Sequence, residues 1–186
     1  LNEPRKGAMP LAQAFALIHA DHPAATLGFS GQASEATIAA IRAAVPPSAA
    51  GAITFHGVGT VEVLPALYSN ATVFVNPAIW EAQGMVLVEA LASGTPVVAC
   101  AHGGMPDIVS DRRIGRLFEP GELGASASNA QGLATAILEA AELARDPATE
   151  AACREHARKF SFDRLGPIYE AVFRGTSDDA CAGDDA

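Results

Sequence analysis

Two glutamates separated by seven residues carry the clearest chemical signal in this sequence. Glu81 lies in a loop that follows an apolar run, and Glu89 lies within the apolar stretch that begins at Met85. Ionised carboxylates only accept hydrogen bonds, so two of them at one cleft suit a ligand with neighbouring hydroxyl donors. If a helix starts beside Gly84, Glu89 falls in its second turn, about 6 to 8 Å along the axis. The pair therefore predicts a site for a sugar-bearing ligand.

The start of the same helix predicts an anion site. The amides near Gly84, Met85 and Val86 have no intrahelical partners, and the helix dipole favours negative charge at this end. Gly84 has no Cβ, so a ligand can approach the backbone closely. A phosphate or a sugar oxygen is the expected occupant.

A plain structural role explains most pairs of glutamates. In that interpretation Glu81 stabilises the start of the helix through its dipole, and Glu89 is a solvated residue on an exposed face. The stretch from Met85 to Ala92 is, however, apolar almost all round, which predicts a buried helix. A buried charge is costly unless a partner or ligand receives it. We therefore expect Glu89 to be buried and functional.

The elements that must position these residues alternate between short β-like runs and longer Ala-rich helical stretches. This alternation predicts an α/β fold, a Rossmann-like parallel sheet with helices on both faces, in which ligands bind at the carboxyl ends of the strands. Gly94 is expected to end a helix in the left-handed conformation, and Pro96 prevents its continuation. Strands are expected at residues 25–29, 52–55, 72–75, 97–100 and 116–118, and helices at 8–20, 35–44, 61–68, 85–92, 133–143, 151–159 and from Ser161 or Asp163 to about Phe173.

Composition limits the classes of protein that are possible. The chain has 186 residues, 49% of them hydrophobic and 18% charged, which is typical of a globular domain. No apolar run approaches the roughly 18 residues that cross a bilayer. The net charge of −9 argues against general binding to nucleic acid or anionic lipid, so an anionic ligand needs a local positive site.

The three cysteines lack metal-ligand spacing, which predicts no zinc cluster and no disulfide framework. A reducing compartment follows, and we expect a cytoplasmic location. The acidic segment 176–186 holds four Asp and is expected to be disordered. Among the remaining candidates, His56 and His102 are expected to have packing or loop roles, Gly103-Gly104 is more typical of a turn than of a phosphate loop, and Trp80 is expected to pack against neighbouring loops.

Six landmarks in order resemble one known family. Over residues 5–120 the sequence looks like the C-terminal, donor-binding half of retaining glycosyltransferases of family four, which have the GT-B fold. The landmarks are Lys6-Gly7, Phe55-His56-Gly57-Val58, Leu67-Tyr68-Ser69-Asn70-Ala71, the pair Glu81 and Glu89, Glu89-Ala90-Leu91-Ala92-Ser93-Gly94-Thr95-Pro96-Val97-Val98-Ala99, and Gly103-Gly104-Met105-Pro106-Asp107-Ile108-Val109.

The resemblance implies a catalytic role for Lys6 and Glu81. Lys6 would neutralise the diphosphate of a nucleoside diphosphate sugar, linked to UDP, GDP or ADP, and Glu81 would lie beside the transferred sugar. It also implies that no metal or other cofactor is required.

The resemblance assigns the remaining site residues to binding. Glu89 would hold the ribose hydroxyls. The backbone of Gln83, Gly84, Met85 and Val86 would contact hexose hydroxyls or the diphosphate. The loop of His56, Gly57 and Val58 would flank the base.

Departures from the family pattern matter as well. Gln83 stands where the family commonly has an apolar residue, so the floor of the sugar pocket is expected to be polar. The family's diphosphate-binding Arg falls immediately before Leu1. The first strand of this half and the whole acceptor-binding N-terminal half are also expected outside the chain. Residues 1–175 would then form one nucleotide-sugar-binding domain that is inactive by itself.

Two other functions stay open. The chain can be a degenerate, non-catalytic module that binds a nucleotide or a protein partner. It can also belong to another GT-B enzyme, such as a nucleotide-sugar epimerase or a phosphorylase. The retained glutamate pair argues against the first, and the order of the landmarks argues against the second. Membrane association of a full-length protein is compatible with the sequence but is not indicated by it.

Overall fold

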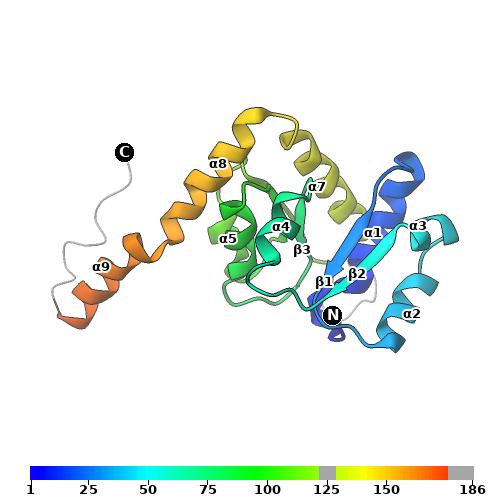
Figure 1. Ribbon diagram of the computed structural model, residues 1–186, viewed down its shortest axis with the longest axis horizontal. Helices are drawn as coiled ribbons and strands as arrows, with labels where there is room; N and C mark the ends of the chain where they lie inside the picture. The colour runs from blue at the N-terminus through cyan, green and yellow to red at the C-terminus, as the bar shows by residue number, and fades with distance from the viewer. Residues whose placement is uncertain (122–128, 176–186) are drawn as a thin grey trace.

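The structure is a computed structural model that describes residues 1–121 and 129–175, and these residues form an α/β fold (Figure 1). The acidic segment 176–186 lies outside the described residues. The strands are β1 (Leu27–Ser30), β2 (Ile53–Gly57), β3 (Phe74–Asn76), β4 (Val97–Cys100) and β5 (Gly115–Phe118). The helices are η1 (Pro4–Lys6), α1 (Ala8–Asp21), α2 (Glu35–Ala43), α3 (Pro47–Gly51), α4 (Leu64–Ser69), α5 (Met85–Ala92), α6 (Met105–Ile108), α7 (Ala130–Leu143), α8 (Pro147–Ala157), η2 (Arg158–Phe160) and α9 (Phe162–Phe173).

The strands pair in parallel, as predicted, but they form two sheets instead of one. The order is β1-β2 in the first sheet and β3-β4-β5 in the second. The predicted α/β fold with parallel strands is confirmed, and the division into two sheets arises because, among the described residues, no strand lies between β1 and β3 to join them.

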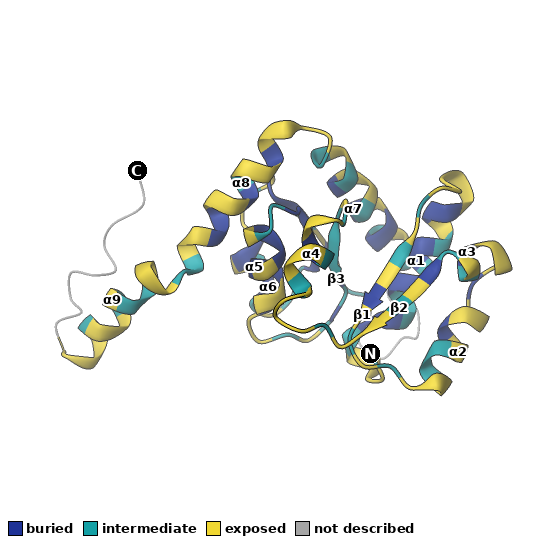
Figure 2. Ribbon diagram, in the orientation of Figure 1, coloured by how far each residue is buried: buried dark blue, intermediate teal, exposed yellow. Residues whose placement is uncertain are grey.

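The core explains why β4 is the most apolar strand. All four of its residues are buried, which requires cover on both faces of the sheet. Helices α5 and α7 both pack against β4, and α5 packs in turn on α8 while α7 packs on α1. Figure 2 shows the same division, with buried residues concentrated where these helices face the sheet.

Local sequence signals place most helix ends. Gly84 at φ 79° precedes α5, and Gly94 at φ 89° follows its last turn, as predicted. Helix α8 begins at Pro147 instead of residue 151, since Asp146 accepts a hydrogen bond from the Ala148 amide and proline suits a first turn. The short helices α3 and α6, which also carry a proline in their first turn, were not expected.

Helix α9 differs from the other long helices because none of its residues is buried (Figure 2). It leads away from the two sheets in Figure 1, and Phe162 and Phe173 are exposed at its two ends. No helix within the described ranges is long and apolar enough to cross a membrane.

Candidate functional site

Lys6 and Glu81 meet at the carboxyl end of β3. Lys6 Nζ lies 3.0 Å from Glu81 Oε2, and the two side chains are 37% and 26% exposed. The lysine ends η1, and the glutamate lies in the loop between β3 and α5. The structure therefore brings together the two residues that the resemblance names as catalytic, although 75 positions separate them in the chain.

Backbone contacts fix the lysine against this loop. The Ile79 amide donates to the Arg5 carbonyl at 3.0 Å. Gly7, at φ 71°, lies so close to the Pro77 carbonyl that a Cβ on it would overlap with the oxygen. Glycine is needed directly after Lys6, because only glycine adopts this conformation without strain and permits this approach.

Gly103 and Gly104 support the same loop from the other side. A Cβ on Gly103, which has φ 65°, would overlap with the Glu81 carbonyl oxygen, and a Cβ on Gly104 would overlap with that of Ala82. The prediction of a plain turn did not include this close contact of the two glycines with the loop that carries Glu81. The two glycines let the segment after β4 pack directly on the backbone that carries Glu81.

The start of α5 is open on the side expected to bind ligand. Gly84 is buried, while Gln83, Met85 and Val86 are exposed. The first amides of an α-helix have no intrahelical acceptor, so those of Met85 and Val86 remain suited to an anion.

Glu89 corrects one expectation, since the residue is exposed and not buried. Met85, Val86 and Glu89 share the open face of α5, whereas Leu87, Val88, Ala90 and Leu91 are buried. The nearly continuous apolar sequence of α5 conceals this open face.

Tyr68 is a site residue that the sequence-based reasoning did not assign. Its hydroxyl donates to Glu89 Oε2 at 2.8 Å, and the residue is only 7% exposed. Burial, and then the neighbouring Glu89 carboxylate, raise the pKa of Tyr68, so the phenol stays protonated. The signal available in the sequence was the landmark Leu67-Tyr68.

The loop of His56, Gly57 and Val58 lies at the carboxyl end of β2, in the other sheet. His56 and Val58 are exposed, and His56 Nε2 lies 3.3 Å from Thr54 Oγ1. Within the described ranges, no hydrogen bond or ion pair joins this loop to Lys6, Glu81 or Glu89. Its part in the site stays a prediction.

Trp80 contacts a neighbouring loop, as predicted, although most of its side chain stays exposed. The residue is 61% exposed, and its ring lies 5.6 Å from that of His102. His102 Nδ1 is buried and has no hydrogen-bond partner among the described residues. Trp80 directly precedes Glu81 in the chain, and His102 directly precedes Gly103, which packs on the Glu81 backbone.

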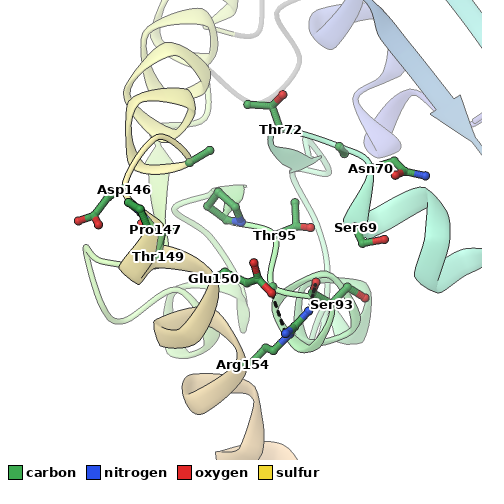
Figure 3. Close-up of a pocket in the computed structure, with 14 residues that line it drawn as sticks. Ser69, Asn70, Thr72, Ser93, Thr95, Asp146, Pro147, Thr149, Glu150 and Arg154 are labelled. Atoms are coloured by element: carbon green, nitrogen blue, oxygen red, sulfur yellow. Dashed lines mark hydrogen bonds and ion pairs between the residues drawn. The ribbon is translucent and has the colours of Figure 1, made fainter.

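The opposite end of the three-stranded sheet holds a polar cavity of about 410 Å³ (Figure 3). Its lining includes Ser93, Thr95, Glu150 and Arg154 but none of the predicted site residues. Across residues 1–121 and 129–175, no group of His, Cys, Asp and Glu side chains is arranged to hold a metal ion.

Comparison with known proteins decides the family. A family model described as glycosyl transferases group 1 matches residues 1–142. The chain belongs to this family. Sulfoquinovosyl transferase of Arabidopsis thaliana is a relative of this group 1 glycosyltransferase, 40% identical over 72 residues, which are 37% of the chain and 14% of the relative.

Solved glycosyltransferase structures confirm the fold. Sucrose-phosphate synthase from Thermosynechococcus elongatus matches with a TM-score of 0.73 and 30% identity, over 93% of this chain and 44% of that one. The pneumococcal O-GlcNAc transferase GtfA, solved in complex with UDP and GlcNAc, matches with a TM-score of 0.76 and 20% identity, over 95% and 34%. The group 1 glycosyltransferase chain thus spans less than half the length of each of these relatives.

Proposed function

We propose that this chain is the donor-binding half of a retaining glycosyltransferase of family four. The full-length enzyme would transfer a hexosyl group from a nucleoside diphosphate sugar to an acceptor hydroxyl. The observation that carries the proposal is the Lys6–Glu81 pair, 3.0 Å apart, beside the open start of α5. One cation, one carboxylate and free amides at a single loop suit a ligand that joins an anionic group to a sugar.

Each group in this arrangement has a distinct task. Lys6 and the amides at the start of α5 receive the diphosphate and stabilise the charge that grows on it as the sugar leaves. The diphosphate replaces Glu81 as the partner of Lys6, which frees the Glu81 oxygens for sugar hydroxyls. Glu89 accepts hydrogen bonds from the ribose. The positive charge comes from the protein, so we propose that no metal or other cofactor takes part.

The relatives support the nature of the donor. GtfA was solved with UDP and GlcNAc, and its fold covers 95% of this chain. We extend nucleotide-sugar binding to this chain and leave the base open among uracil, guanine and adenine. The loop of His56, Gly57 and Val58 would flank the base, and the exposed Gln83 would contact the hexose.

The strand order supports the assignment to one half of a larger enzyme. The sheets β1-β2 and β3-β4-β5 fit the doubly wound order 3-2-1-4-5-6 if its first strand, which the described residues lack, lies between β1 and β3. A further strand between β1 and β3 would join the two sheets. The acceptor site would lie on a separate domain, and residues 1–175 would form the donor domain.

We propose a cytoplasmic location on the evidence of the cysteines. Cys100 and Cys153 are buried free thiols, which a reducing compartment preserves.

Calorimetry tests the proposal by measuring the affinities for UDP, GDP and ADP. The proteins compared are wild type, Glu89→Ala and Glu81→Ala, and the control is Glu150→Ala at the other end of the sheet. We expect wild type to bind one of the three. Glu89→Ala should lower that affinity about tenfold, because it removes hydrogen bonds to a charged acceptor. Glu81→Ala should alter the preference among nucleotide hexoses but leave binding of the bare diphosphate nearly unchanged.

A degenerate binding module is distinguished by the same titration. Such a module would bind the nucleoside diphosphate but show no difference between Glu81→Ala and wild type with any nucleotide hexose. Absence of binding to all three diphosphates by wild type would remove the proposal.

A further inference from the structure

Tyr68 is held in place through both its ring and its backbone. Its ring meets that of Phe74 edge-on, with centroids 5.1 Å apart. Its carbonyl accepts a hydrogen bond of 2.7 Å from the buried hydroxyl of Thr95, which Figure 3 shows at the start of the segment leading into β4. The phenol therefore reaches Glu89 from a rigid base in the core.

Glu89 itself has no such support from its own helix. It lies on the exposed face of α5, and a glutamate there samples several rotamers in water. The hydrogen bond from Tyr68 occupies Oε2 and selects the rotamers that keep it. Oε1 and the second lone pair of Oε2 stay available to a ligand, because a carboxylate has about four acceptor positions.

We propose that Tyr68 is a positioning residue that fixes the Glu89 carboxylate for the ribose hydroxyls, and that Thr95 fixes Tyr68 in turn. The inference rests on the proposed function, in which Glu89 receives the ribose. It also gives a physical reason for the landmark that contains Tyr68 and for Thr95 in the landmark that begins at Glu89. The segments containing Tyr68 and Thr95 are joined to each other by one hydrogen bond and to Glu89 by another.

A merely structural tyrosine would behave differently. Phenylalanine retains the ring that packs on Phe74 and loses only the hydroxyl. If Tyr68 only fills the core, Tyr68→Phe changes the melting temperature and leaves recognition of the ribose unchanged. If Tyr68 positions Glu89, the substitution lowers the contribution of the ribose hydroxyls to binding.

The test compares each nucleoside diphosphate with its 2′,3′-dideoxy analogue by calorimetry, using whichever of UDP, GDP and ADP wild type binds most tightly. We expect the ratio of the two affinities to fall about tenfold in Tyr68→Phe, as for loss of one ordered hydrogen bond to a charged group. The matched control is Tyr169→Phe, at the exposed second tyrosine of the chain, where the ratio should equal that of wild type.

An unchanged ratio in a folded Tyr68→Phe protein would overturn the positioning role and leave the proposed function standing. A wild type that binds a diphosphate but shows no preference for ribose would overturn both the ribose assignment and the role of Tyr68. Absence of any diphosphate binding would overturn the proposed function itself, and the positioning role with it.

A second measurement covers the case in which Tyr68→Phe does not fold. In wild type labelled with carbon-13 at its two tyrosines, the diphosphate should shift the ring signal of Tyr68 and not that of Tyr169. In Glu89→Gln, the Tyr68 signal should move before ligand is added, and its response to ligand should shrink. A Tyr68 signal that responds neither to ligand nor to Glu89→Gln would overturn the positioning role.

Discussion

The two ends of the three-stranded sheet each carry an ion pair, yet they differ in the backbone that surrounds the pair. At the carboxyl end, Lys6 and Glu81 are 3.0 Å apart and 37% and 26% exposed. At the amino end, Arg154 and Glu150 are closer, at 2.7 Å, but more exposed, at 49% and 60%. The distance between the charges therefore does not distinguish the two ends.

The state of the helix starts does distinguish them. Helix α5 starts at the carboxyl end, where its free amides and positive dipole favour an anion. At the amino end α4, α5 and α7 terminate and α8 begins, all beside the cavity of Figure 3. The start of α8 is already occupied by acidic side chains, since Asp146 accepts a hydrogen bond from the Ala148 amide and Glu150 lies in the first turn, whereas no side chain caps α5. Arg154 donates to the Ser93 carbonyl there at 3.4 Å, a use of positive charge that completes a helix terminus. Backbone packing differs too, because close glycine contacts fix Glu81 at the carboxyl end.

Gly103→Ala should have the largest effect on stability and binding. It disrupts the packing on Glu81 at the carboxyl end of the sheet and leaves the amino end intact. Alanine at φ 65° is strained, and its Cβ would overlap with the Glu81 carbonyl. We expect a loss of more than about 2 kcal/mol in the free energy of unfolding, with weaker diphosphate binding. Thermal and denaturant unfolding measure the first, and calorimetry the second.

The matched control for this substitution is Gly51→Ala, where no atom lies within 4 Å of the added Cβ. It should change stability by less than about 1 kcal/mol in either direction. Equal losses in the two variants would mean that the contact between Gly103 and Glu81 contributes nothing specific.

The next largest effect is expected when Lys6→Ala, at the carboxyl end, is compared with Arg154→Ala, at the amino end. If the diphosphate binds at the carboxyl end, Lys6→Ala should lower affinity for the nucleoside diphosphate about tenfold and hardly change that for the nucleoside. The loss should shrink at high salt, because part of Lys6 is exposed. Arg154→Ala should leave both affinities unchanged. A loss of diphosphate affinity in Arg154→Ala, or an equal loss of nucleoside affinity in Lys6→Ala, would contradict the assignment.

Local signals made the positions of Gly84 and Gly94 predictable, because a helix end depends on its own few residues. The pairing of Tyr68 with Glu89 was not predictable, since it depends on how α4 packs on α5. The exposure of Glu89 was missed for a related reason: apolar Met85 and Val86 lie on an open face, so apolar sequence did not mean burial. The resemblance alone placed Lys6 and Glu81 in one site, because the two residues are distant in sequence, and their direct contact was not predicted.

Helix α8 carries Arg154 near the amino end of the sheet, and His156 anchors the same helix to α6. Acid should weaken that anchor. The buried His156 Nε2 lies 2.8 Å from the Ile108 carbonyl, and desolvation lowers the pKa of His156 below 6.5. The native state therefore resists protonation. Above pH 6.5 the imidazole is neutral in both states, and below it the unfolded chain takes up the proton first.

Stability should accordingly fall as the pH drops below about 6.5, by up to about 1.4 kcal/mol per pH unit for this group. Denaturant unfolding between pH 7.5 and 5 measures it. His156→Gln should make the free energy of unfolding depend less on pH than in wild type. His22→Gln, which replaces an exposed histidine after α1, should leave the pH dependence as in wild type. A wild-type curve that matches that of His156→Gln over this range would refute the anchor.

The smallest effect should come from Glu150→Ala, which removes the acidic half of the pair at the amino end. Both side chains of that pair are about half exposed, and the glutamate is four residues from the arginine on one helix. Pairs of this kind contribute about 0.3 to 0.5 kcal/mol, because water and salt screen them. Arg154 would keep its hydrogen bond to the Ser93 carbonyl after the substitution. We therefore expect a loss in unfolding free energy of no more than about 0.5 kcal/mol, which high salt should abolish. A loss several times larger, or any change in diphosphate affinity, would show that the amino end of the sheet contributes more than a screened surface pair. The contrast between an open helix start at α5 and a capped one at α8 would then no longer separate the two ends.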